Sequence, residues 1–184
     1  MDLDFTEEQQ MLREMVRGMC AEFASVDAVR AMEDDPTGYP AEFWKQLGEL
    51  DLLGLTIPEE YGGSGQTALE AAIVYAEFGR SLAPSPHFVS SVMSAGALVL
   101  AGSGEQKRAW LPKIVSGDAI LTPAWLEPKG GYGPAGVQLR AVADGADYRL
   151  TGTKQHVLFA SAATRLLVLV RTGDGDEDIA LLLV

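Results

Sequence analysis

The stretch VSGDAILTPA, residues 115–124, marks the point where the hydrophobic period of the chain changes. Before Gly117, apolar residues recur at three- and four-residue intervals, which is the spacing of one face of an amphipathic helix. After Gly117, short apolar or alternating runs separated by Asp and Gly turns are typical of β-strands. The pattern therefore predicts an α+β protein, with an N-terminal all-α helical bundle in residues 1–117 and a β-domain in residues 118–184.

Capping patterns locate several helix starts upstream of Gly117. In a capping box, a Ser or Thr hydroxyl accepts from a free backbone N–H three residues on, where a Glu or Gln side chain reaches back. Pro40 is expected as the first residue of another helix, because that position needs no backbone N–H. The capping-box spacing is present in three pairs: Thr6 with Gln9, Thr67 with Glu70, and Ser103 with Gln106.

The helix ends are less sharply defined by the sequence. The first helix is expected to end before the turn-rich residues 33–38, and the helix that starts at Pro40 is expected to end near Gly54. A further helix is expected near Phe88–Leu100. Pro112 is expected to end or kink the short helix that contains Trp110, because proline lacks the N–H that a helix interior uses.

Downstream of Gly117, strands are expected wherever apolar residues run together or alternate. The expected segments are Ala119–Ala124, Val137–Val142, Tyr148–Leu150, Gln155–Phe159, Leu166–Val170 and Ile179–Val184.

Charge and cysteine content exclude several classes of protein. The formal net charge of −12 argues against nucleic-acid binding, and residues 1–60 hold 15 of the 26 acidic residues but 4 of the 14 basic ones. No apolar run approaches the roughly 20 residues that a membrane helix needs, so no membrane insertion is expected. The acidic start predicts that no signal peptide is present. A single cysteine, Cys20, excludes an internal disulfide and a multi-cysteine metal site and favours a cytoplasmic location.

The end of the chain is unusually apolar. Residues Ile179–Val184 are apolar to the last position, whereas a natural terminus is usually polar and frayed. We expect either that the chain is cut from a longer protein or that another chain covers this end, which predicts an oligomer.

Several stretches together resemble the acyl-CoA dehydrogenase family of flavoproteins. The strongest is LGLTIPEEYGGSG at residues 53–65, and the others follow in the order of the family over essentially the whole chain. They read FTEEQ at 5–9, FWKQLGEL at 43–50, EFGR at 77–80, EQKRAWLP at 105–112, EP at 127–128 and LTGTK at 150–154.

The resemblance implies an N-terminal helical domain followed by the first part of a middle domain, which is a partial β-barrel or β-sandwich. It also implies an oxidoreductase of lipid metabolism that uses FAD to convert an acyl-CoA to the 2,3-enoyl-CoA, with an electron-transfer flavoprotein as electron acceptor. The family takes its catalytic glutamate from a C-terminal domain that these residues do not match. The resemblance therefore assigns no catalytic residue to this chain, and no metal.

The positions that the family uses for flavin carry unusual residues in this sequence. By resemblance, the cofactor-binding positions are Trp125 and Leu126 in PAWLEP and His156 and Leu158 in GTKQHVL, and the position that contacts acyl-CoA is Tyr132. Leu126 and Leu158 stand where the family has hydroxyl side chains, which would donate hydrogen bonds to a reduced flavin. Backbone N–H groups could still hold the ring, so the site is expected to be degenerate or shared with a partner.

Simpler interpretations stay open for two of these positions, and two other features are not expected to form a site. His156 is either a flavin contact or a polar side chain on a partly exposed strand, and Trp125 is either a flavin wall or a packing aromatic. The Gly62–Gly65 loop lacks the Lys-Ser/Thr of a phosphate-binding loop and is expected to be a structural turn. Cys20 has no basic neighbour or paired histidine, so a nucleophilic role is not expected.

Three functional hypotheses remain. The first is an acyl-CoA dehydrogenase subunit, inactive as this chain alone, that forms a homo- or hetero-oligomer with another such subunit, which supplies the catalytic glutamate. The second is a non-catalytic structural or interaction subunit that keeps the fold with a degenerate flavin site. The third is a fragment of an ordinary enzyme. The sequence leaves the acyl group open.

Overall fold

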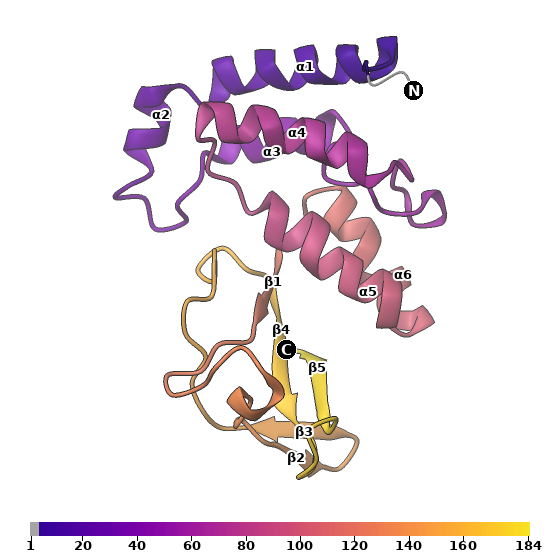
Figure 1. Ribbon diagram of the computed structural model, residues 1–184, viewed down its shortest axis with the longest axis vertical. Coiled ribbons are helices and arrows are strands. Elements are labelled where there is room, and N and C mark those ends of the chain that lie inside the picture. Colours follow the sequence, from indigo (N-terminus) through magenta and orange to yellow (C-terminus); the bar gives the residue numbers. More distant parts are fainter. Residues whose placement is uncertain (1–3) are drawn as a thin grey trace. The chain divides into compact units, whose positions relative to one another are not determined.

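The computed structural model describes residues 4–184, and it separates into two compact units, the first ending at Ala119 and the second spanning Ile120–Val184 (Figure 1). The first unit is helical and the second contains all the strands of the described residues, as the change in hydrophobic period predicts. The expected α+β fold class is confirmed. Because the strands of the second unit form open sheets, the described part of the chain contains no closed barrel.

Within the described residues the helical unit is built from six α-helices, one 3-10 turn and one π-helix. The helices that pack together are α1 with both α3 and α4, and α5 with α6 (Figure 1). In chain order the elements are α1 (Glu7–Phe23), α2 (Val26–Ala31), α3 (Ala41–Glu49), η1 (Glu59–Tyr61), α4 (Ala68–Ser81), η2 (Phe88–Ser94), α5 (Ala95–Ala101) and α6 (Gly104–Val115).

All three expected capping boxes are present, at the N-termini of α1, α4 and α6. Pro40 lies at the N-cap of α3, one position before the helix. Three details differ from the expectation. The first helix breaks at Ala24, after which Ser25 caps α2. The helix α3 ends at Glu49 rather than near Gly54. Pro112 lies inside α6, which continues to Val115.

The core of the helical unit lies between α1, α3 and α4. Phe43 and Leu47 of α3 are fully buried, and the Phe43 ring packs against Phe78 of α4 with 5.4 Å between the ring centres. The helix η2 is a π-helix, and its Ser94 hydroxyl donates a hydrogen bond of 2.7 Å to the Val89 carbonyl. Burial of apolar side chains from these helices, from residues 52–57 and from α6 therefore stabilises this unit.

The Gly62–Gly65 loop closes as a structural turn. A Cβ atom at Gly63 would overlap the carbonyl oxygens of Ile57 and Gly54, so only glycine fits there. The backbone N–H groups of the next two residues donate to the same two carbonyls. These groups are therefore occupied within the loop, and they are not free to bind a phosphate.

The β unit contains two small sheets. In one, β1 (Leu121–Ala124) pairs parallel with β4 (Arg165–Arg171), which pairs antiparallel with β5 (Ile179–Leu183). In the other, β2 (Ala141–Asp144) and β3 (Asp147–Leu150) form a hairpin. The order β1-β4-β5 leaves one edge of β1 and one edge of β5 without a strand neighbour among the described residues. The segment η3 (Pro134–Gly136) is a single 3-10 turn.

The expected strand at Gln155–Phe159 is wrong. This segment contains no strand, and both His156 and Phe159 have a φ angle of 53°, in the left-handed region. A strand cannot contain that conformation, because its residues need extended backbone. The segment instead runs as an irregular connection between β3 and β4.

Candidate functional site

The two segments with the expected cofactor residues lie side by side in the β unit. The backbone N–H of Gln155 donates a hydrogen bond of 2.8 Å to the Leu126 carbonyl. The Thr122 hydroxyl donates one of 2.8 Å to the Leu158 carbonyl. Residues 122–127 and 154–158 are therefore fastened together at both ends, although they are about 30 positions apart in the sequence.

A buried ion pair lies at the centre of this junction. Lys154 Nζ and Glu127 Oε1 are 2.7 Å apart, and both side chains are about nine-tenths buried. The Glu127 carboxylate also accepts from the backbone N–H groups of Gln138 and Leu139, each at 3.0 Å. Burial alone would raise the pKa of Glu127, but the hydrogen bonds from Lys154, Leu139 and Gln138 hold that pKa below its ordinary value. Glu127 is therefore an ionised carboxylate that joins three segments.

The four expected cofactor residues are solvent-accessible to different degrees. Trp125 is 41% exposed and Leu158 is 60% exposed, His156 is exposed, and Leu126 is half-buried. The leucines offer no side-chain donor, so an indole, an imidazole and apolar surface are what the side chains can present to a ligand. Such a set fits a planar ring by stacking and apolar contact, and hydrogen bonds to that ring would come from the Trp125 indole, the His156 imidazole or the backbone.

The structure places Tyr132 beside Trp125 and Leu126 but not beside the other two residues. These three residues line a pocket of about 270 Å³, together with the loop residues Gly131, Gly133, Pro134 and Val137 and the strand residues Leu169 and Ile179. Tyr132 is 94% exposed, so its side chain lies at the rim. Neither His156 nor Leu158 lines this pocket.

The loop that contains Tyr132 is held by hydrogen bonds from Arg171 of β4. This side chain is 7% exposed, and its guanidinium donates to the carbonyls of Val137, Pro134 and Gly175 at 2.8, 2.6 and 2.6 Å. One buried cation thereby satisfies three backbone carbonyls. These hydrogen bonds fix the backbone of the loop to β4.

Sequence reasoning missed the contacts of Glu127, Lys154 and Arg171. Glu127 and Lys154 belong to the motifs that carry the family resemblance, yet nothing in the sequence indicates that they pair across 27 positions. Arg171 ends an apolar strand, where an arginine ordinarily reaches solvent. The one feature of the sequence that could have indicated these contacts is a charged residue at the border of each apolar run.

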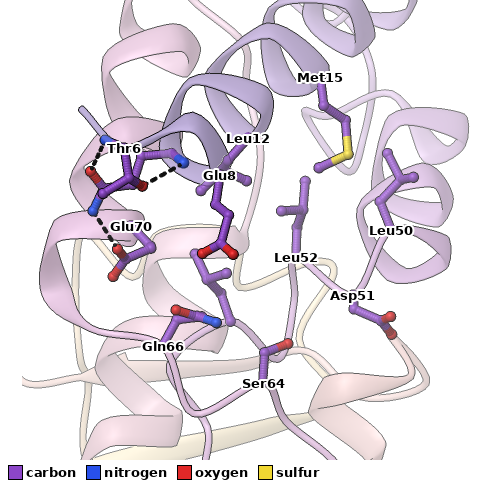
Figure 2. A pocket seen from close by; sticks show the side chains of 12 residues that line it. Thr6, Glu8, Leu12, Met15, Leu50, Asp51, Leu52, Ser64, Gln66 and Glu70 are labelled. Carbon is purple, nitrogen blue, oxygen red and sulfur yellow. Dashed lines mark hydrogen bonds between the residues drawn. The ribbon is translucent and has the colours of Figure 1, made fainter.

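A second pocket lies in the helical unit, with a volume of about 350 Å³. Figure 2 shows Glu8 and Met15 of α1 directed into the space bordered by Leu52 and Gln66. At its edge the Gln9 amide donates a hydrogen bond of 2.9 Å to Glu70. The complete lining is Thr6, Glu8, Gln9, Leu12, Met15, Leu50, Asp51, Leu52, Leu55, Ser64, Gln66 and Glu70.

Two other titratable residues of the helical unit are structural. His87 is 2% exposed, with Nδ1 at 2.5 Å from the Tyr75 hydroxyl and Nε2 at 3.0 Å from the Leu52 carbonyl. Burial lowers the pKa of His87 to about 4, so the ring is neutral. Burial also raises the pKa of the Cys20 thiol to about 11, which makes Cys20 a poor nucleophile, as expected.

Residues 4–184 contain no cluster of three or more His, Cys, Asp or Glu side chains that could hold a metal ion. No helix within the same residues is both long enough and apolar enough to span a bilayer.

Comparison with known proteins identifies the family. Residues 6–118 match the family model described as the acyl-CoA dehydrogenase N-terminal domain. The whole chain is 36% identical to a probable acyl-CoA dehydrogenase of Bacillus subtilis, YngJ, of which it covers 49%. This chain belongs to the acyl-CoA dehydrogenase family, and it spans about half the length of the curated relatives it matches.

Solved structures show the same fold. The chain superposes on the ChsE4-ChsE5 complex from Mycobacterium tuberculosis with a TM-score of 0.85 at 33% identity, covering 100% of this chain and 48% of that one. It superposes on a glutaryl-CoA dehydrogenase from Mycobacterium smegmatis in complex with FADH2 with a TM-score of 0.85 at 31% identity. That match covers 98% of this chain and 46% of the other. The resemblance inferred from the sequence is confirmed.

Proposed function

We propose that this chain is the N-terminal part of a flavin-dependent acyl-CoA dehydrogenase subunit, with residues 1–117 as the helical domain and 118–184 as an incomplete middle domain. The whole enzyme would oxidise an acyl-CoA to the 2,3-enoyl-CoA and pass electrons to an electron-transfer flavoprotein in the cytoplasm. The observation that carries the proposal is the side-by-side placement of Trp125–Leu126 and His156–Leu158 within a chain of this family.

In this proposal, the chain contributes a binding surface rather than the reacting groups. Trp125 and His156 would stack against FAD, Leu126 and Leu158 would exclude water from the ring, and Tyr132 would contact the acyl-CoA. FAD supplies hydride acceptance when bound. Removal of the α-proton needs a carboxylate beside the thioester, and in this family that glutamate comes from the C-terminal domain. A further segment or a partner subunit would supply it.

A second candidate function is a non-catalytic subunit with the same fold and a degenerate flavin site. It is favoured by the two leucines, which remove two side-chain hydrogen bonds to a flavin, worth about 1–3 kcal/mol each. The names of the ChsE4-ChsE5 complex and the Tcur3481-Tcur3483 steroid acyl-CoA dehydrogenase each join two components, which supports a heteromeric assembly here. A flavin absorbance spectrum of the purified chain separates the two candidates.

The test is an assay of the chain alone with added FAD, a panel of acyl-CoAs and an artificial electron acceptor. We expect no turnover, because the carboxylate that removes the α-proton is not provided. The double variant Leu126→Thr/Leu158→Thr is expected to retain FAD better than the original chain and still give no turnover. Turnover by residues 1–184 alone would show that the chemistry has been misplaced.

A further inference from the structure

The Glu127 carboxylate connects the cofactor segments to the loop that contains Tyr132. It faces three chain segments at once: its own, residues 125–127; the end of the loop, at Gln138 and Leu139; and the segment that begins at Lys154. The Glu127 backbone is also linked to the third segment, because the Gln155 side chain donates a hydrogen bond of 3.3 Å to the Glu127 carbonyl. One side chain therefore holds the positions of both expected ligand surfaces.

The partners of Glu127 have few alternatives. Lys154 Nζ contacts the Glu127 carboxylate and, at 3.3 Å, the Trp125 carbonyl, and the lysine side chain is about nine-tenths buried. Breaking a buried pair leaves an uncompensated charge, which costs more than the pair contributes. The N–H groups of Gln138 and Leu139 would likewise lose their acceptor. A change at Glu127 must therefore move several segments together.

The adjoining part of the loop is fixed by a different side chain. Arg171 holds the carbonyls of Pro134 and Val137, while Glu127 holds the N–H groups of the two residues that follow. A cation on carbonyls and an anion on amides thus clamp residues 134–139. The pocket that contains Trp125, Leu126 and Tyr132 lies against this clamped loop.

We infer that Glu127 is a positioning residue, which sets the cofactor-facing segments 125–126 and 156–158 and the acyl-CoA-facing loop 131–137 in one fixed arrangement. The inference rests on the proposed function. Glu127 itself contacts no ligand in this scheme. It acts through Lys154 and through the backbone groups that it holds, and its charge is needed because the partner is a buried cation.

The test compares FAD binding by the purified 184-residue chain and by four variants. Binding is measured by the quenching of flavin fluorescence and by the visible circular dichroism of bound flavin. Glu127→Gln keeps the shape and one acceptor oxygen but removes the charge, and Lys154→Met removes the cation. Asp174→Asn is the matched control, because its pair with Arg140 is exposed on the same unit. Glu127→Asp is the conservative variant that keeps the charge on a shorter side chain.

We expect Glu127→Gln and Lys154→Met each to weaken FAD binding about tenfold, which corresponds to about 1.4 kcal/mol, and to change the flavin dichroism. Asp174→Asn should match the original chain, and Glu127→Asp should recover part of the affinity. Thermal unfolding identifies variants that are unfolded at the assay temperature. Such a variant is compared with the original chain at a lower temperature, at which both are folded.

Two results overturn the inference. One is unchanged affinity and dichroism in folded Glu127→Gln, which would leave Glu127 with a role in stability only. The other is equal losses in Asp174→Asn, which would show a general effect of charge. If the original chain binds no FAD, the cofactor part of the proposed function fails instead. Amide exchange at Gln138, Leu139 and Gln155 then decides: joint acceleration in Glu127→Gln supports the clamp, and unchanged exchange refutes it.

Discussion

The Gln9 side chain in α1 donates a hydrogen bond of 2.9 Å to the Glu70 carboxylate in α4. Each of these two residues is also the third residue of its own helix and completes the capping box there. The two helix starts, 61 positions apart, are thus joined in one network. Helix capping, which is a local property, is here linked to the packing of α1 against α4.

Replacing Glu70 should break the link between the starts of these two helices. Glu70→Ala removes the capping box of α4 and the contact with Gln9, and we expect a loss of about 1–2 kcal/mol in the free energy of unfolding. The control is Glu42→Ala, an exposed acid in the first turn of α3, which should cost at most about 0.5 kcal/mol. Urea denaturation measures both, and equal losses would contradict the prediction.

Glu70 should also make the free energy of unfolding depend on pH in the acid range. Hydrogen bonds from Thr67 and Gln9 lower the pKa of Glu70 from 4.5 to about 2. Because the folded pKa lies below the unfolded value, this contribution is complete above about pH 4.5 and is lost as the pH falls towards 2. In Glu70→Ala the stability should fall less steeply over that window than in the original chain.

Removing only the cation of the ion pair between α1 and α4 should cost more stability than removing both charges. Glu77 is 4% exposed and accepts from Arg17 Nε and Nη2 at 3.0 and 2.8 Å. Arg17→Met strands a buried carboxylate, so we expect a loss of about 3 kcal/mol, whereas Arg17→Met with Glu77→Leu should recover much of it. Lys45→Met, which breaks an exposed pair with Glu49, should cost under about 0.5 kcal/mol. Thermal and urea unfolding measure the series.

His87 should make the helical unit less stable in mild acid. Burial lowers its pKa from 6.5 to about 4, so between these values the unfolded chain binds more protons than the folded one. Stability from this group is therefore complete above about pH 6.5 and declines as the pH falls, by about 2 kcal/mol between pH 6.5 and 5. Urea denaturation at pH 7, 6 and 5 tests this. His87→Gln should show little slope in that range, and a slope equal to the original would refute the assignment.

Leu82 offers a stabilising substitution. It lies just after α4 with a φ angle of 52°, in the left-handed region, and its side chain is 76% exposed. Glycine is the residue usually found at this position of a helix end, so Leu82→Gly should raise the free energy of unfolding by about 0.5–1 kcal/mol. Leu100→Gly is the matched control, an exposed leucine inside α5, and it should lower that free energy by about 1 kcal/mol.

The sequence by itself determined the features that depend on neighbouring residues. The capping boxes at Thr6, Thr67 and Ser103 are satisfied within four positions, so their partners are visible in the sequence. The hydrophobic period changes after Gly117 because helices and strands present different spacings to a core. The family resemblance was likewise readable, since it depends on the order of short motifs.

Tertiary structure decided what lies between distant residues. The alternating pattern of Gln155–Phe159 predicted a strand, but Leu126 and Thr122 take up its backbone groups, and the left-handed residues His156 and Phe159 bend it. Lys154 and Glu127 pair because residues 155–158 run beside β1 and its continuation in the opposite direction, with Gln155 bonded to Leu126 and Leu158 bonded to Thr122. Such a contact depends on packing across the sheet and not on spacing along the chain. For that reason the residues that hold the site together were found only in the structure.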